Sequence, residues 1–431
     1  MPSPARVTAL QVLAAVAEGR ATLADALSAP QVEALGPEDR ALLHELVLGV
    51  LRRRGWLDHV IAGLASRPLR RMAPGVLDGL RLGVYQLLFT RIAPHAAVNE
   101  AVDLARATEP RAAGFVNGVL RRLQREGAPA EPDAVKDPRA WLVTYGSLPG
   151  WLAERWLERA GAAAAVARAR ALLQPPSVHL RLNPRVPDAP ARLEAAGVRV
   201  QPGGVPGSLT LLEGRLTPLI EDGVAYAQDE GSQLVAQLAA AEGLVLDACA
   251  APGGKSLLLA DLGKGATRVV AAEVSRRRVL SLERLRRRWR AAEVHVVAAD
   301  ALHPPFARPF DAVLLDAPCS GLGTLARHPD IRWRSSAGEL RRQSARQRAL
   351  VESLAPLVRP GGRLVYAVCS TEPEENEEVV TPFLERHPEF EVEELPVWAK
   401  EHGNERSRAG PFLTTGPGPV RFFAARLRRS R

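Results

Sequence analysis

Three short apolar segments in the second half of the chain each end in a cluster of glycine, proline, aspartate or cysteine. Written with the cluster that follows, they are 244–255, 313–321 and 364–370. From about residue 229 such segments alternate with helical patterns, which predicts a parallel sheet covered by helices on both faces. Open sheets of this kind bind ligands at the carboxyl ends of their strands. The three clusters are therefore expected to border one crevice.

The rest of the chain has a different character. Residues 1–128 carry apolar residues at helical spacing and predict an all-α domain. A Pro-rich and Glu-rich stretch at 126–133 is typical of a linker. Residues 137–228 predict a small α+β module. Residues 229–431 form the α/β domain, in which the spacing predicts strands at 244–247, 268–272, 294–299, 312–315 and 363–368 and a final edge strand at 422–427.

Composition limits the classes of protein to consider. The 431 residues contain 57 Lys and Arg against 48 Asp and Glu, a net charge of +9. This excess favours a polyanionic partner such as a nucleic acid, although an arginine-rich composition gives the same excess. No apolar stretch reaches transmembrane length. The 3 cysteines cannot all pair, so a reduced, cytoplasmic protein without membrane contact is the simplest expectation.

The turn at 250–256 follows a predicted strand and precedes a predicted helix. Its glycines allow a ligand to approach the backbone, and a helix N-terminus favours a negative group. The spacing matches neither the phosphate loop GxxxxGK[ST] nor GxGxxG. A methyl donor with an amino-acid carboxylate, S-adenosylmethionine, fits better than a nucleoside triphosphate. Glu273 closes the second strand and is expected to accept both ribose hydroxyls, while Asp300 after the third strand is expected to bind the adenine amine.

Cys319 and Cys369 each follow an apolar strand and precede a serine. Two thiols beside a methyl donor indicate covalent catalysis on a pyrimidine, because a thiolate that adds to C6 makes C5 nucleophilic. Lys255 would raise the thiolate fraction, and Asp316 is expected to bind the N3 and amine edge of the base and to protonate N3. Cys249 lies inside the cofactor turn, where a small buried side chain is the simpler interpretation.

These clusters together resemble the RNA (cytosine-5) methyltransferases of the NOL/NSUN superfamily. The resemblance also covers 228–233, the Arg-His-Pro-Asp-Ile-Arg-Trp segment at 327–333 and the Pro-Glu-Glu-Asn-Glu segment at 373–377. Residues 45–52, 83–89 and 94–100 are similar to the NusB-like domain that bacterial members carry at their N-terminus. The chain is thus identified, over its whole length, as a member of the RsmB (Sun/Fmu) family of bacterial 16S ribosomal RNA (cytosine-5) methyltransferases.

The resemblance implies a NusB-like helical domain, a small RRM-like module and a Rossmann-like domain that binds S-adenosylmethionine. It implies that Cys369 is the nucleophile and that Cys319 helps release the product. The cofactor-binding residues that it implies are Cys249, Ala250, Ala251, Pro252, Gly253, Gly254, Lys255, Glu273, Asp300 and Asp316. Two residues depart from the family pattern, because Val368 stands where the family usually has threonine and Glu273 where it often has aspartate.

The expected partner is 16S ribosomal RNA, bound by a monomer without a metal ion. Arg327, His328 and Arg332 beside the cysteine loop and Arg181 in the middle module are expected on the RNA-binding face, and Trp333 is either a stacking platform or core. The arginine-rich stretch 276–290 has Leu282, Leu285 and Trp289 on one side and predicts an amphipathic helix with a solvated basic face.

Three other functions stay open at this point. The first is a DNA cytosine-5 methyltransferase, in which the nucleophile would be Cys319. The second is a methyltransferase acting on tRNA or another RNA. The third is a ribosomal-RNA-binding factor with a vestigial methyltransferase fold, although the intact site residues argue against it.

Overall fold

The computed structural model describes residues 2–403, 410–415 and 420–430, which divide into two compact units. The first comprises the chain up to Pro175 together with Leu325–Ser335, and the second comprises Pro176–Thr324 and the chain from Ser336 onward. Each unit is described by itself. No described helix is long and apolar enough to cross a membrane.

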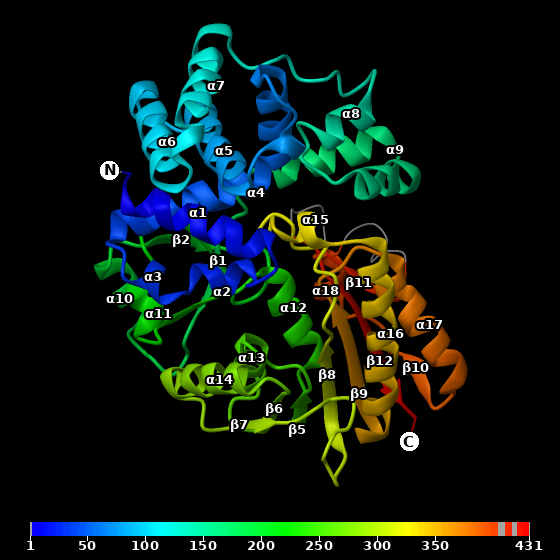
Figure 1. Cartoon of the computed structure of the whole chain (residues 1–431). Helices are drawn as coiled ribbons and strands as arrows, with labels where there is room; N and C mark the ends of the chain where they lie inside the picture. The colour runs from blue at the N-terminus through cyan, green and yellow to red at the C-terminus, as the bar shows by residue number, and fades with distance from the viewer. Residues whose placement is uncertain (1, 404–409, 416–419, 431) are drawn as a thin grey trace. The chain divides into compact units, whose positions relative to one another are not determined.

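The first unit is entirely helical (Figure 1). Its helices are α1 (Pro4–Ala17), α2 (Leu23–Leu27), α3 (Pro30–Glu33), α4 (Pro37–Leu64), α5 (Pro74–Phe89), α6 (Pro94–Thr108), α7 (Ala113–Glu126), α8 (Pro138–Val143), α9 (Gly150–Leu172) and α15 (Ile331–Arg334). One apolar core joins α1 and α4–α7. Proline at the first turn starts many of these helices, because its missing N–H has no intrahelical partner at that position.

The second unit begins with a small antiparallel sheet in the order β2-β3-β1-β4. Its elements are β1 (His179–Leu182), α10 (Ala189–Ala195), β2 (Arg199–Pro202), β3 (Leu209–Glu213), α11 (Thr217–Glu221) and β4 (Ala225–Ala227). This sheet has a core of its own around Leu180, Leu193 and Val224. The expected α+β module is therefore present, but the division falls at Pro175 rather than at residue 137, because α8 and α9 belong to the helical unit.

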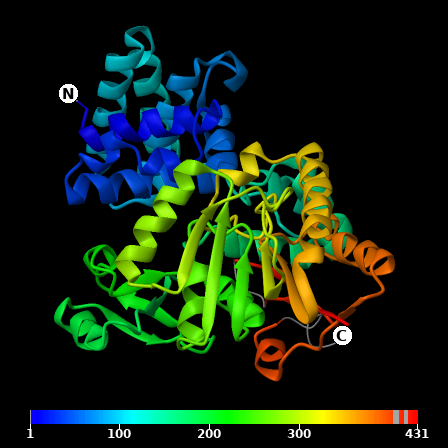
Figure 2. The same ribbon diagram turned by 90° about the horizontal axis from the view of Figure 1, so that it is seen from below.

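The large sheet has the order β10-β12-β9-β8-β5-β6-β7 (Figure 2). Its strands are β5 (Gly243–Asp247), β6 (Thr267–Glu273), β7 (Val294–Ala298), β8 (Phe310–Asp316), β9 (Val358–Val368), β10 (Phe390–Val392) and β12 (Phe423–Arg429), with β11 (Leu413–Thr414) beside β12. Strands β5–β9 pair in parallel, whereas β12 is antiparallel to β9 and β10. The final strand was expected at an edge, but it lies between β9 and β10, so its position was wrong.

Helices cover both faces of this sheet. Along β9, Val365 and Ala367 pack with α12 (Glu230–Ala239), α13 (Gly254–Leu262) and α14 (Arg276–Trp289), whereas Leu364 and Tyr366 pack with α16 (Ala337–Leu354) and α17 (Glu377–Arg386). Successive strand residues point to opposite faces, so a strand covered on both faces is apolar at every position. The helix predicted over 276–290 is confirmed as α14, with Leu282, Leu285 and Trp289 buried.

Candidate active site

The predicted cofactor and cysteine clusters follow the parallel strands at one edge of the large sheet. The turn 249–255 follows β5, and Glu273 and Asp316 are the last residues of β6 and β8. Asp300 lies two residues beyond β7, and Cys369 directly follows β9. The chain order reverses between β5 and β8, which is the point in such a sheet where a ligand crevice forms. The expected common edge is therefore confirmed.

The turn after β5 is built for close approach of its backbone to other groups. Gly253 has a φ of +115°, a conformation that favours glycine, and it caps the N-terminus of α13. A Cβ on Gly254 would lie 2.4 Å from the ring of Tyr226, so no larger residue fits there. Arg278 donates to the carbonyl of Ala251 at 2.8 Å. The turn is thereby fixed by its glycines and by groups on both sides.

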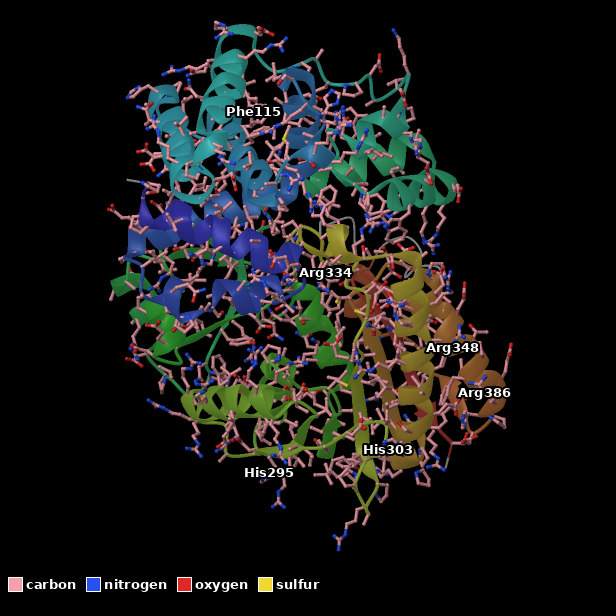
Figure 3. All side chains as sticks on the ribbon, in the orientation of Figure 1. Phe115, His295, His303, Arg334, Arg348 and Arg386 are labelled. Carbon is pink, nitrogen blue, oxygen red and sulfur yellow. The ribbon has the colours of Figure 1, made fainter. Side chains whose placement is uncertain are left out.

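The two acids at the ends of β6 and β7 differ in environment. Glu273 is buried, accepts from the N–H of Ser275 at 2.9 Å and lies 3.3 Å from a guanidinium nitrogen of Arg278. Asp300 is half-exposed and accepts from the N–H of Leu302 at 3.0 Å. His303, labelled in Figure 3, lies 3.2 Å from its other oxygen. Both carboxylates are thus oriented by local hydrogen bonds at the strand ends.

Asp247, the last residue of β5, provides a test of whether these residues fit a cofactor. Its Oδ2 accepts from the hydroxyl of Ser256 at 2.6 Å, but its Oδ1 is buried and lacks a partner within the described ranges. Burial, first among several causes, raises the pKa of Asp247 to about 6. A buried carboxylate oxygen without a hydrogen-bond donor is energetically costly. The ammonium group of S-adenosylmethionine would supply the missing donor to Oδ1. The strand ends therefore fit this cofactor.

This environment gives a prediction for the protein without cofactor. Asp247→Asn is expected to raise the free energy of unfolding by about 1–3 kcal/mol above pH 6 and to change little near pH 4. The sign follows because a raised pKa stabilises the folded state at low pH, and this contribution is lost as pH rises toward the folded pKa of about 6. Urea unfolding across this pH range measures the difference.

A matched control distinguishes this effect from a general response to acid removal. Backbone hydrogen bonding from Leu302 lowers the pKa of Asp300, so Asp300→Asn is expected to give no stabilisation. The same Asp247 variant should bind S-adenosylmethionine more weakly, as measured by calorimetry. A stability difference that does not vary with pH would contradict the assignment.

The two thiols expected to act together are adjacent. The Sγ atoms of Cys319 and Cys369 lie 3.2 Å apart. The pKa of Cys319 is raised well above its ordinary value, first by the hydrogen bond with Cys369 and then by burial, so Cys319 is a thiol at neutral pH. Burial raises the pKa of Cys249 to about 12, which fits its interpretation as an inert buried side chain.

Lys255 and Asp316 form an ion pair beside these thiols. The Nζ of Lys255 lies 2.5 Å from Oδ2 of Asp316, and the lysine side chain is only 13% exposed. Burial acts to lower the pKa of Lys255, but the charges of Asp316, Asp247 and Cys369 act against it, and the net direction is upward. Lys255 is therefore an ammonium ion that favours a neighbouring thiolate.

Glu375 is a buried site residue to which the sequence analysis gave no role. It belongs to the Pro-Glu-Glu-Asn-Glu segment 373–377, which the sequence analysis named only as part of the family resemblance. The fold buries Glu372 and Glu375 completely, and Glu375 accepts hydrogen bonds from Ser320, next to Cys319. The motif was therefore visible in the sequence, but only the tertiary arrangement shows that Glu375 is buried and contacts Ser320.

Arg181 and Arg332 are removed from the predicted RNA-binding face, because both are buried. Arg181 donates to Gln228 and to the carbonyl of Gly254 and pairs with Asp261, so it supports the cofactor turn.

In the helical unit, Arg332 donates to the carbonyls of Arg52, Ser147 and Leu325, and burial lowers its pKa to about 9. Trp333 donates to the carbonyl of Leu51 at 2.7 Å and packs on the helical core. Of the two interpretations of Trp333, a stacking platform or a core residue, this contact favours the core residue. Arg327 is half-buried and His328 is exposed. The segment's one-turn helix α15 also carries Arg334, labelled in Figure 3.

Comparison with known proteins agrees with this architecture. Residues 235–428 match the family model of 16S rRNA methyltransferase RsmB/F, and residues 3–125 match that of the NusB family. A Bacillus subtilis protein named probable ribosomal RNA small subunit methyltransferase B is 36% identical over 83% of this chain and 82% of its own. The Pseudomonas putida ribosomal RNA small subunit methyltransferase B is 34% identical over 98% of both chains. The crystal structure of PH0851 superposes with a TM-score of 0.79 at 25% identity, over 99% of both chains.

Proposed function

Because the chain belongs to the RsmB/F family of 16S rRNA methyltransferases, we propose that it methylates C5 of a cytosine in 16S ribosomal RNA through a covalent adduct between Cys369 and C6. The chain is an S-adenosylmethionine-dependent RNA methyltransferase. The observation that carries the covalent route is the pair of thiols, with Sγ atoms 3.2 Å apart, at the carboxyl ends of β8 and β9.

We assign the cofactor to the residues at the carboxyl ends of β5, β6 and β7. The turn 249–255 supplies the backbone of α13's N-terminus for the carboxylate, Asp247 the acceptor for the ammonium group, Glu273 the acceptor for the ribose and Asp300 the acceptor for the adenine amine. When bound, S-adenosylmethionine supplies an electrophilic methyl group at its sulfonium. All other steps belong to the protein and the RNA.

The chain's own residues act on the base in two stages. In the first, the Cys369 thiolate forms a bond to C6, the ring electrons shift toward N3 and C5, and Asp316 binds the N3 and amine edge and passes to N3 a proton from the Lys255 ammonium ion that it contacts. C5 then takes the methyl group, and the N3 proton returns to Lys255 by the same route. In the second, the C5 proton is lost to water, its electron pair forms the C5=C6 bond, and the C6–S pair returns to Cys369. The nearby Lys255 ammonium ion favours the thiolate at both stages.

The target base has to leave its stack to reach the thiols, because C6 is not accessible within a stacked helix. Since Arg181 and Arg332 are buried, we propose that the RNA contacts lie on other basic side chains. The exposed arginines of α14, such as Arg284 and Arg287, are candidates. The cytoplasmic location and the monomeric state stay predictions.

The substrate is tested by methyl transfer to three RNAs. Purified protein, S-adenosylmethionine and either 16S ribosomal RNA, assembled small subunits or bulk tRNA are incubated, and nucleosides are analysed by mass spectrometry. We expect 5-methylcytidine in 16S RNA only. Product in tRNA only would establish the tRNA alternative. Cofactor binding without any product in the three RNAs would favour the non-catalytic alternative.

A further inference from the structure

Glu375 is a buried carboxylate that accepts hydrogen bonds from Ser320, which follows Cys319, and from Gln347, which also contacts the loop around Cys319. It ends the short helical turn Pro373–Glu375 and is 0% exposed. Its Oε1 accepts from the N–H of Ser320 at 2.7 Å and from Nε2 of Gln347 at 3.1 Å, and its Oε2 accepts from the hydroxyl of Ser320 at 2.5 Å.

These three donors are all neutral, whereas buried acids are usually paired with a positively charged group. A buried ionised carboxylate is costly even when it is hydrogen-bonded, and apolar replacement of buried charges is often neutral or stabilising. Holding a loop in place does not by itself require a charge. The burial of a carboxyl group at this position is therefore better explained by its effect on a neighbouring group.

The neighbouring group is Cys319. The N–H that Glu375 accepts belongs to the peptide between Cys319 and Ser320, so the carboxylate fixes the backbone directly after the thiol. On the other side of Cys319, Gln347 donates to the carbonyl of Pro318 at 2.9 Å. Glu375 and Gln347 thus hold the loop on both sides of Cys319.

The same contacts set this loop against the end of β9. Cys319 and Ser320 lie beside Cys369 and Ser370, with 3.2 Å between the two sulfur atoms and 3.4 Å between the two hydroxyl oxygens. The backbone of Glu375 is fixed in turn, because the hydroxyl of Tyr366 donates to its carbonyl at 2.6 Å. The carboxylate therefore has little freedom to move away from Ser320.

We propose that Glu375 is a positioning residue for product release: it holds the Cys319 thiol against Cys369. This rests on the covalent mechanism proposed above. As the C6–S bond breaks, its electron pair returns to the sulfur of Cys369, which takes the proton of Cys319. Solvent then restores the Cys319 proton. The negative charge of Glu375 is also among the causes that raise the pKa of Cys319, after the hydrogen bond with Cys369 and burial.

The test separates the rate of methyl transfer from the rate of adduct breakdown. In single turnovers with small-subunit RNA, Glu375→Gln is expected to transfer the methyl group within about twofold of the wild-type rate. Breakdown of the protein–RNA adduct is expected to slow by about tenfold to a hundredfold, since loss of positioned proton transfer has effects of this order. Ser320→Ala, which keeps the N–H bond and loses the hydroxyl bond, should have a smaller effect of the same kind.

Glu378→Gln is the matched control, because it makes the same change at an exposed position three residues away, and it should leave both rates unchanged. A pH profile distinguishes the electrostatic part from a structural one. Without the negative charge of Glu375, Cys319 loses its proton at lower pH. The rate of adduct breakdown, which needs that proton, should therefore begin to fall at lower pH in Glu375→Gln than in the wild type.

The failures of the two proposals differ. If Cys319→Ala traps no adduct while the wild type methylates RNA, the covalent mechanism fails. If Cys319→Ala traps an adduct but Glu375→Gln and Ser320→Ala break theirs down at the wild-type rate, the role of Glu375 is wrong. Equal slowing of transfer and breakdown, or an unshifted pH profile, would also overturn it. If Glu375→Gln does not fold, as judged by thermal melting, the result of Ser320→Ala decides.

Discussion

Cys369→Ala is expected to lower methyl transfer by more than about a thousandfold and to abolish the protein–RNA adduct, whereas Cys319→Ala is expected to accumulate that adduct. Without the Cys369 thiolate nothing adds to C6, so C5 stays a poor nucleophile. Without Cys319 the adduct forms and takes the methyl group, but the departing sulfur lacks its neighbouring proton donor at 3.2 Å. Denaturing gels of protein incubated with cofactor and small-subunit RNA measure the adduct.

The third cysteine is the control for this experiment. Its pKa of about 12 keeps Cys249 protonated, so Cys249→Ala should form and release the adduct although its position in the cofactor turn can change the affinity for S-adenosylmethionine. An adduct in Cys369→Ala but not in Cys319→Ala would reverse the roles and favour the DNA-methyltransferase type of mechanism. Adduct loss in all three variants would point to a role of the thiols in folding.

The sequence could predict those site residues whose position depends only on the succession of neighbouring strands, turns and helices along the chain. A strand followed by a turn places its last residue at the edge of the sheet, so Glu273, Asp316 and Cys369 could be assigned from the alternation of strands and helices alone. The glycine turn could be assigned for the same reason, because the φ of Gly253 reflects a requirement that is visible in the residue type.

The residues that sequence analysis misplaced depend on contacts between distant segments. Arg181 reads as a surface residue of an alternating strand, yet Asp261, eighty positions away, pairs with it in the interior. Arg332 reads as part of a basic loop, yet carbonyls from α4 and from Ser147 accept its hydrogen bonds. Strand β12 was identified, but its insertion beside β9 depends on a pairing that the sequence does not specify locally.

The partly buried ion pair of Lys255 and Asp316 is expected to be required for activity, whereas its net contribution to stability is small. Asp316→Asn and Lys255→Met should each lower methyl transfer by at least about a hundredfold. Each should also lower the free energy of unfolding by about 1–3 kcal/mol, because a partly exposed partner reduces the 3–5 kcal/mol typical of a broken buried pair. The asparagine leaves the Lys255 ammonium ion, 13% exposed, without its carboxylate.

The double variant Lys255→Met, Asp316→Leu separates the two roles. Apolar side chains of similar volume need no partner, so the free energy of unfolding should return to within about 1 kcal/mol of the wild type. Methyl transfer should stay at the level of the worse single variant, because the base edge has lost its proton donor and the thiolate its neighbouring cation. Urea unfolding and initial rates on small-subunit RNA measure the two quantities on the same preparations. Recovery of activity together with stability would show that the pair only supports the fold, and the proton to N3 would then have to come from another group at this edge of the sheet.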